Sequence, residues 1–300
     1  MIRSKLLTAI SGSGEGGNIY IGEKEFLSPG FYYWNVPLSV TRIHVCCIGA
    51  GAYNDYALTT TYNGGGGGGL VWANDINVDP GKQLLIRVGG PETGTGKNRH
   101  STIGIPKQND QDFDEIFVQA FGGLSSGPGG GYDLQGRAGG GGTGGNGSSE
   151  RIINNGSNIE VWTGAGGGAA GYQGNGGAGA TGQVNAVSNG GQGGGAAGGF
   201  TYYRNTGFQG GVSRGSAGGG VGVKGVGSSG AGRPVQGEGQ NPVRGNSGSS
   251  GTGADFGAGG AGLYNESHLV APEYTKPGGG AVRIIWGIKY SYPNNADVSQ

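Results

Sequence analysis

The sequence predicts an all-β protein: a small β-sandwich or barrel module with a long glycine-rich insertion, which we predict to pack as polyglycine II-type helices with surface loops. Short runs of β-branched and aromatic residues alternate with Pro, Gly and Asp turns in the first part of the chain. No segment combines helical periodicity with helix caps. Most of the 78 glycines fall within one later region, far above ordinary glycine usage.

The glycine content divides the chain into four parts. Residues 1–18 are an N-terminal segment, interpreted as an attachment arm. Residues 19–121 form the β module, and residues 122–280 form the glycine-rich region. Residues 281–300 supply a C-terminal strand that returns to the β module, followed by a tail. The glycine-rich region is therefore predicted to be tethered to the module at both ends.

The β module is read from apolar runs that end at turn residues. The first run is stopped by Pro37, and the third ends at the turn Asp79-Pro80-Gly81. Trp34, Trp72 and Trp286 are assigned to the β core. The predicted strand regions are Gly30–Val40, Arg42–Gly51, Leu70–Val78, Lys82–Gly90, Glu115–Gly123 and the returning Gly278–Ile288.

The six glycines at 64–69 raise the question of what glycine does in a folded chain. Extended helices with three residues per turn can pack closely where glycine recurs at every third position. Gly168, Gly171, Gly174 and Gly177 keep that period, as do shorter series at 176–182 and 219–225. We predict that these extended glycine helices form ordered rods joined by loops of more varied composition, with low-complexity disorder as the alternative. Residues 64–69 are interpreted as one such rod, where any Cβ would clash, or else as a flexible hairpin loop.

Composition excludes several classes of protein. The chain has 19 basic and 19 acidic residues and no long basic run, so nucleic acid is not an expected partner. No apolar stretch approaches the length of a membrane span, and the N-terminus lacks a secretory apolar region, so we expect a chain kept in the cytoplasm in which it is made. Cys46 and Cys47 are adjacent in a predicted strand, so one should face the core and one should not. We expect reduced thiols, with a strained vicinal disulfide as the alternative.

Motifs for catalysis and cofactors give weak signals. Gly-x-Gly-x-x-Gly matches arise by chance at this glycine density, and none opens a helix. The run Asp110–Glu115 resembles a calcium loop but lacks its glycine, which favours a solvated acidic loop before a strand. His44, His100 and His268 are scattered and suggest neither a metal cluster nor a nucleophile and base. We expect no enzyme activity, no cofactor and no bound metal.

The segments between glycine blocks carry the best binding signal. Tyr, Trp, Arg and Asn in loops on a rigid scaffold are typical of adaptable recognition surfaces, and aromatic faces suit sugar rings. The alternative is that these side chains fill gaps between rods or lie in a subunit interface. These segments are residues 150–163, 200–208, 233–246 and 263–275. The candidate binding residues are Trp162, Tyr202, Tyr203, Arg204, Phe208, Tyr264 and Tyr274.

Several motifs together resemble the glycine-rich tail proteins of tailed bacteriophages. They are FYYWNVPLSVTRIHVCCIGAGA at Phe31–Ala52, GGGGGGLVWANDINVDPGKQLLIRVGG at 64–90, PGGGAVRIIWG at 277–287 and YPNNADV at 292–298. The region between them is similar in composition to the adhesins that cap T-even-type long tail fibres, in which packed polyglycine helices present variable loops to a host receptor. No segment matches the fibre-attachment region of those adhesins.

The resemblance implies a non-enzymatic structural protein of the virion, located at a tail fibre or tail tip. Its expected partners are other virion tail proteins and a host cell-surface glycan or outer-membrane protein, bound as an adhesin would bind during host attachment. Fibre symmetry implies a homotrimer. The main alternative is a purely structural virion component in the tail, collar or capsid. An ice-binding protein and a glycan-degrading enzyme are further alternatives, testable by thermal hysteresis and by release of reducing ends.

Overall fold

The computed structural model describes part of the chain in full and further segments by their backbone. Residues 21–53, 64–91, 98–108, 110–124, 129–148, 165–179, 218–226, 256–257, 277–296 and 298 are described in full, and the backbone is described for 2–6, 97, 151–154, 159–162, 202–205, 212–214 and 263–265. In this part of the chain the one helix is the 3-10 turn η1 (Lys97–Arg99), and every other regular element is a strand.

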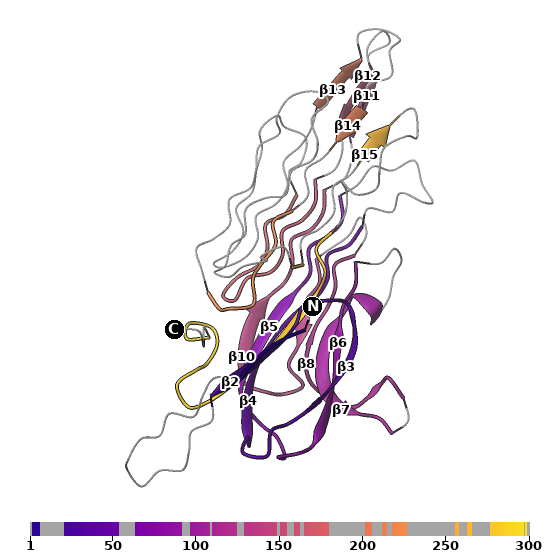
Figure 1. Cartoon of the computed structure of the whole chain (residues 1–300). Helices are drawn as coiled ribbons and strands as arrows, with labels where there is room; N and C mark the ends of the chain where they lie inside the picture. The colour runs from indigo at the N-terminus through magenta and orange to yellow at the C-terminus, as the bar shows by residue number, and fades with distance from the viewer. Residues whose placement is uncertain are drawn as a thin grey trace.

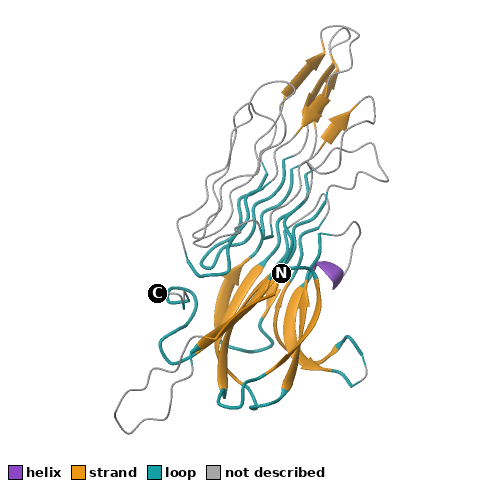
Figure 2. Ribbon diagram, viewed as in Figure 1, coloured by secondary structure: helices purple, strands orange, loops and turns teal. Residues whose placement is uncertain are grey.

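Two antiparallel sheets form a sandwich, which confirms the predicted all-β fold class (Figure 2). The first sheet has six strands in the order β1-β2-β16-β4-β5-β10, and the second has five in the order β3-β6-β7-β8-β9. The first sheet consists of β1 (Ile2–Leu6), β2 (Gly22–Phe26), β16 (Ala281–Trp286), β4 (Arg42–Ile48), β5 (Leu70–Asn77) and β10 (Gly139–Gly142). The second consists of β3 (Gly30–Asn35), β6 (Gln83–Val88), β7 (Ser101–Pro106), β8 (Phe113–Ala120) and β9 (Tyr132–Asp133).

The core between the sheets follows from alternation along the strands, because successive residues face opposite sides of a sheet. Val45 and Cys47 of β4 point into this core, as do Ile284 and Trp286 of β16. The ring of Trp286 lies 5.7 Å from that of Trp34, centroid to centroid, so both tryptophans occupy the core to which the sequence assigns them.

A second apolar cluster covers the other face of the six-stranded sheet. Residues 169–172, 221–226, 290–296 and 298 pack there against side chains of β4, β5 and β16. Trp72 packs against this outer cluster instead of the sandwich interior. Cys46 also belongs to the outer cluster and Cys47 to the inner one, and both are buried free thiols. The expectation that one cysteine faces away from a core was wrong, because this sheet is covered on both faces.

Segments remote in sequence complete the sheets. β16 lies between β2 and β4, so the chain end closes the middle of the six-stranded sheet. β9 pairs with β8 and β10 pairs with β5, so two short strands of the region 122–280 belong to the sandwich. β1, from the predicted N-terminal arm, pairs with β2. The boundary expected at residue 121 therefore does not separate the sheets from the glycine-rich region.

Extended glycine-rich segments continue several strands beyond the end of the sandwich (Figures 1 and 2). We call the described ones the glycine bundle. They are residues 49–53, 64–69, 121–124, 129–131, 143–148, 165–170 and 174–179. Most of their backbone hydrogen bonds join different segments.

The hydrogen bonds of residues 64–69 repeat every three residues. The amides of Gly64 and Gly67 donate to the carbonyls of Ser148 and Gly145, each at 2.9 Å. The amides of Gly66 and Gly69 donate to Leu124 and Phe121 in the same way. The carbonyls of Gly65 and Gly68 accept from Gly167 and Ala170. A β-strand pairs on two sides with a period of two, so this three-residue period in several directions is that of an extended threefold helix.

Close backbone contact explains why these positions are glycine. A Cβ placed on Gly64, Gly67 or Gly68 would lie 2.0 Å from a carbonyl oxygen of a neighbouring segment, and one on Gly65 or Gly69 would lie 2.1 Å from one. The expectation that a Cβ would clash in residues 64–69 is confirmed for these five glycines.

Two glycine blocks differ from the predicted rods. Residues 138–142 are a glycine run within the region 122–280 that we predicted to form rods, but Gly139–Gly142 form β10. Gly168, Gly171, Gly174 and Gly177 keep the period of three but do not lie in one extended segment, because the amide of Gly171 donates to the carbonyl of Gly174, and the amide of Gly168 donates to Gly177 across a hairpin. Spacing cannot reveal such a reversal, because glycine fits both the rod and the turn. A further glycine run of the region predicted to form rods, residues 190–199, lies outside the described residues.

Candidate functional site

Three of the four predicted binding segments contain short strands at the end of the molecule opposite the sandwich (Figure 1), and the fourth, residues 233–246, lies outside the described residues. We call the short strands at this end the distal strands. They are β11 (Arg151–Asn154), β12 (Ile159–Trp162) and β13 (Tyr202–Asn205), which form one sheet, and β14 (Val212–Arg214) and β15 (Leu263–Asn265), which form another. The interpretation of residues 151–154, 159–162, 202–205 and 263–265 as loops was wrong, because each of these runs forms a strand. Each run has only three or four residues, too few for its alternation to stand out beside glycine-rich flanks.

Strand register sorts the candidate residues into two sets. Trp162 pairs with Tyr202, and Glu160 pairs with Arg204. Residues that pair across an antiparallel ladder share a face, as do residues two apart in one strand. Trp162, Tyr202, Glu160 and Arg204 therefore belong to one face of the β11–β13 sheet, which we call the aromatic-charged face.

Tyr203 falls on the opposite face. It pairs with Val161, which in turn pairs with Ile152. Tyr202, Tyr203 and Arg204 were grouped as the strongest candidates, and the register brings only the first and last of them together. Tyr264 pairs with Ser213 in the other small sheet. Phe208 and Tyr274 lie outside the described residues.

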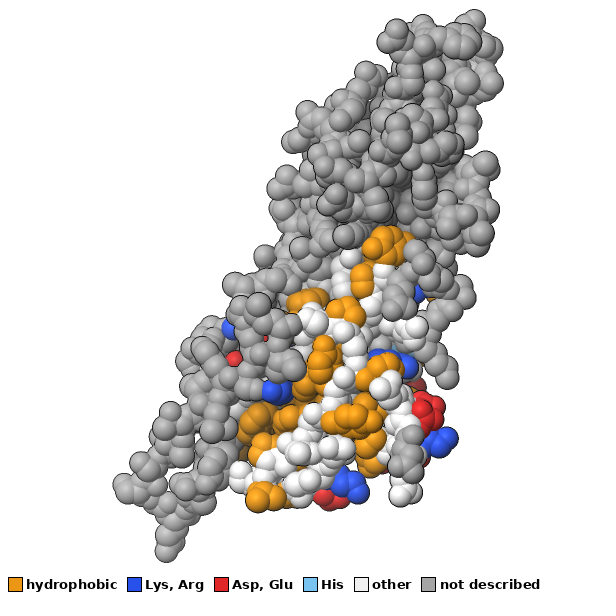
Figure 3. Space-filling view, turned by 45° about the vertical axis from the view of Figure 1, so that its right-hand side comes forward, with side chains coloured by type: hydrophobic (Ala, Val, Ile, Leu, Met, Phe, Trp, Pro, Cys, Tyr) orange, Lys and Arg blue, Asp and Glu red, His pale blue; other side chains and the backbone are white. Residues whose placement is uncertain are grey.

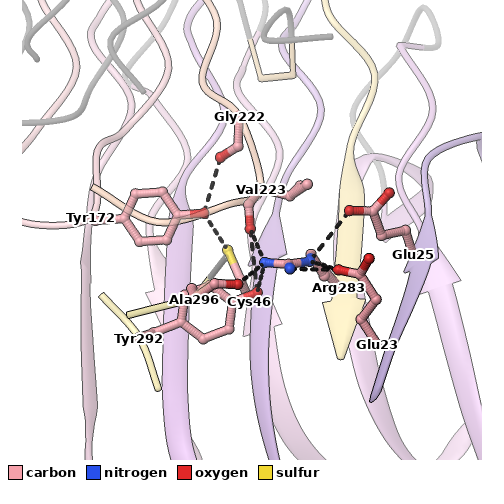
Figure 4. A network of polar contacts seen from close by, with 9 residues as sticks. All are labelled: Glu23, Glu25, Cys46, Tyr172, Gly222, Val223, Arg283, Tyr292 and Ala296. Atoms are coloured by element: carbon pink, nitrogen blue, oxygen red, sulfur yellow. Dashed lines mark hydrogen bonds and ion pairs between the residues drawn. The ribbon is translucent and has the colours of Figure 1, made fainter. Parts of the chain in front are cut away.

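A buried polar network occupies the outer face of the six-stranded sheet (Figure 4). Arg283, on β16, has no exposed surface. Its Nη2 lies 2.6 Å from Oε2 of Glu23, and its Nε lies 3.3 Å from Oε1 of Glu25. Its Nη1 donates to the carbonyls of Ala296 at 2.6 Å and Val223 at 3.3 Å. One guanidinium thus joins three segments that are distant in sequence.

Electrostatics keeps this guanidinium charged. Burial lowers the pKa of Arg283, but Tyr292, Glu23 and Glu25 raise it, and the net pKa lies above the ordinary value for arginine. Burial raises the pKa of the Tyr292 hydroxyl, although the positive charge of Arg283 opposes that shift. The network contacts groups of the chain itself, so it holds segments together and offers no open coordination or binding position at Arg283.

Cys46 and Tyr172 extend the network toward the glycine bundle. The Cys46 thiol donates to the Tyr172 hydroxyl at 3.4 Å, and that hydroxyl donates to the carbonyl of Gly222 at 3.0 Å. Burial raises the pKa of Cys46 to about 12, and burial also raises the pKa of Tyr172. Both groups are therefore neutral at physiological pH, and a nucleophilic thiolate is disfavoured here.

A second group of hydrogen bonds, in addition to the network around Arg283, holds the C-terminal segment to β5. The side-chain Nδ2 of Asn74 donates to the carbonyl of Tyr292 at 2.6 Å, and the Oδ1 of Asn74 accepts from the backbone amide of Tyr292 at 2.9 Å. His44 Nδ1 lies 3.1 Å from the same Oδ1 and accepts from the backbone amide of Asp75 at 3.3 Å. Burial lowers the pKa of His44, while Asp75 and Asn74 partly offset that effect.

We predict that His44 makes folding pH-dependent. Because its pKa is lowered in the folded state, the unfolded chain binds a proton first, and this contribution to stability is lost as pH falls below about 6.5. His44→Gln keeps an acceptor but cannot titrate. The urea midpoint should fall less between about pH 7.5 and about pH 5.5 in this variant than in the wild type. Equal falls in both proteins would contradict the prediction.

The sequence analysis did not identify the residues that form the Arg283 network, nor Asn74, which holds the C-terminal segment. Arg283 was read only as part of the apolar strand AVRIIW, and Glu23 and Glu25 were not singled out. A charged residue inside such a run is the signal that could have indicated a buried ion pair. Asp110 and Asp112 are exposed, as expected for a solvated acidic loop, but Asp114, also exposed, already belongs to β8.

The described residues contain neither a cluster of metal ligands nor a membrane-spanning helix. Within these ranges, no three His, Cys, Asp or Glu residues are grouped as metal ligands. Nor does any helix there have the length and apolar character to cross a membrane.

No protein-family model matches the chain, and no curated protein matches it.

Proposed function

We propose that this chain is a non-enzymatic virion protein of a tailed bacteriophage, located at a tail fibre or tail tip, and that it binds a host-surface glycan or outer-membrane protein through its distal strands. The resemblance of residues 31–90 and 277–298 to glycine-rich phage tail proteins supports the virion role. The observation that carries the binding role is the aromatic-charged face, on which Trp162 pairs with Tyr202 and Glu160 with Arg204.

The chemistry of this face suits recognition. Trp, Tyr and Arg dominate the energetics of binding surfaces because they combine large contact area with hydrogen bonding. A carboxylate and a guanidinium beside aromatic residues suit the hydroxyl groups of a sugar and the polar loops of a protein. Several copies on one particle would multiply a modest affinity at each site.

Cell binding by the purified full-length chain tests the proposal. Trp162→Ala or Tyr202→Ala should weaken binding to susceptible cells by about tenfold or more, the loss typical of a central aromatic contact. Tyr203→Ala is the matched control, since it removes an aromatic residue from the opposite face of the same sheet and should leave binding unchanged. Equal losses from all three variants would contradict the face assignment.

Immunogold labelling of virus particles tests the location. Gold at fibre or tail tips is the expected result. Gold on the capsid, collar or tail shaft, with no binding of the purified chain to cells, would favour the purely structural alternative. The pairing of Ile152, Val161 and Tyr203 on the other face favours that alternative, because an apolar row suits a subunit contact. Release of reducing ends from envelope polysaccharide would overturn the non-enzymatic role.

A further inference from the structure

The sandwich has four edge strands: β1 and β10 in the six-stranded sheet, and β3 and β9 in the five-stranded sheet. An edge strand presents unpaired backbone donors and acceptors that can pair with another chain. Proteins that avoid this use short edge strands, charged residues, proline or a covering segment.

Three of the four edges carry such protection. The sequence of β1 contains Arg3 and Lys5. β9 has only two residues. β10 is made of glycine and lies against the glycine bundle, since a Cβ on Gly142 would lie 2.2 Å from the carbonyl oxygen of Gly174.

β3 has none of these protections among the residues that the structure describes. Its sequence, GFYYWN, contains no charge and no proline over six residues. Phe31 and Tyr33 are 39% and 51% exposed, although they are large hydrophobic residues. Figure 3 brings forward the side on which β3 and β6 lie in Figure 1, and hydrophobic side chains are interspersed there with few charged ones.

We propose that β3 pairs antiparallel with β3 of a second copy of this chain, so that two five-stranded sheets become one continuous sheet. Two copies of the same edge strand related by a twofold axis run antiparallel, so the backbone donors and acceptors of one copy can pair with those of the other. β3 carries no charge that would face its own copy across the axis, and the chain has 19 basic and 19 acidic residues, so repulsion between copies is weak.

The backbone fixes where the axis passes. Gly30 has a φ of 145°, which L-residues rarely adopt, so the regular part of the edge is Phe31–Asn35. Its centre is Tyr33. An axis perpendicular to the sheet at Tyr33 places the two Tyr33 residues opposite each other and each Phe31 opposite Asn35 of the other copy, all on the outer face. This contact is independent of the distal strands and of the proposed receptor role.

The mass of the full chain in solution tests the proposal. Sedimentation equilibrium should give twice the chain mass of 29.7 kDa at micromolar concentration. Tyr33→Lys places like charges across the axis and should give the mass of one chain. Leu38→Lys is the matched control, because Leu38 is 84% exposed in the turn after β3 and its substitution should leave the dimer intact.

A disulfide test does not depend on the tolerance of the fold for lysine. Facing residues of an antiparallel pair have Cα atoms about 4.5–5.5 Å apart, within the range for a disulfide. Tyr33→Cys should therefore form a covalent dimer on mild oxidation, and Leu38→Cys should not. The native Cys46 and Cys47 are fully buried and should not interfere.

Three results would overturn the inference. One is a single-chain mass for the wild type throughout the micromolar range. Another is a mass of three chains, as the expected fibre trimer would give through a different surface. The third is Tyr33→Cys that fails to crosslink more than Leu38→Cys does.

Discussion

Gly67→Ala should unfold or strongly destabilise the protein. Its Cβ would lie 2.0 Å from the carbonyl oxygen of Gly168 and 2.5 Å from the carbonyl carbon. These are backbone atoms of a segment that is itself hydrogen-bonded on several sides, so they cannot rotate away as a side chain can. Overpacking a well-packed site costs about 1–3 kcal/mol and sometimes more, and we expect Gly67→Ala to reach about 3 kcal/mol or above.

Gly131→Ala is the matched control for that experiment. Gly131 also belongs to the glycine bundle, but its Cβ would meet side-chain atoms at ordinary distances of 3.7 and 3.9 Å. We expect a change within about 1 kcal/mol, because alanine also restricts the unfolded chain. Thermal unfolding should separate the two variants by roughly 4 °C or more, at about 2–4 °C per kcal/mol. Similar midpoints would mean that the segments do not pack as closely as described.

Arg283→Met should be the most damaging substitution among the charged residues discussed here. It removes the guanidinium that pairs with the largely buried Glu23 and Glu25, and it leaves the carbonyl of Ala296 without its 2.6 Å donor. Removing one partner of a buried ion pair costs about 3–5 kcal/mol, since the remaining charge stays away from water. Chemical denaturation should show this loss.

Arg42→Met provides the comparison. Arg42 pairs with Asp75 at 4.0 Å, and both side chains are about two-thirds exposed. Exposed pairs contribute about 0–1 kcal/mol, so this variant should be nearly as stable as the wild type. Adding Glu23→Gln to Arg283→Met should recover part of the loss, because it removes one buried charge. An Arg283→Met variant as stable as Arg42→Met would show that the network contributes little to folding.

The buried network also predicts how the C-terminal segment responds to the loss of Arg283. Arg283 and Asn74 hold the segment by the backbone of Ala296 and Tyr292. Tyr292 also stacks on Tyr172, with ring centroids 5.9 Å apart. Loss of Arg283 should therefore loosen this segment before the sandwich unfolds, which links the stability of the outer cluster to one side chain.

The sequence predicted six strands of the sandwich, β3, β4, β5, β6, β8 and β16, because their signal is local. It did not predict β1, β2, β7, β9 or β10. The apolar runs around β4, β5 and β6 end at glycine or proline turns, and alternation along them identifies most inward residues. The tethering of the chain end was also readable, because AVRIIW is a buried strand without a local partner. The predicted clash at the six glycines followed from the same logic, as glycine between apolar strands implies close backbone contact.

The distal strands and glycine blocks were harder to read. Residues 139–142 form a strand while residues 64–69 form an extended threefold segment, although both are runs of glycine. Glycine has no side chain to alternate, so its pattern cannot distinguish the two. Tyr202 and Tyr203 are adjacent in sequence, and only the pairing of β12 with β13 sets their register and places them on opposite faces.

By itself, the sequence determined the all-β class, the location of six sandwich strands and the need for glycine where strands continue into close-packed segments. These properties depend on the conformational preferences of neighbouring residues and on hydrophobic alternation. Only the tertiary structure decided which face of each strand is covered, which glycine runs become strands, and how Arg283 is neutralised. Each of these depends on segments that are remote in the chain, such as Glu23 and Ala296 around Arg283. No local sequence pattern identifies the group that pairs with a buried charge or with a backbone donor or acceptor in the folded protein.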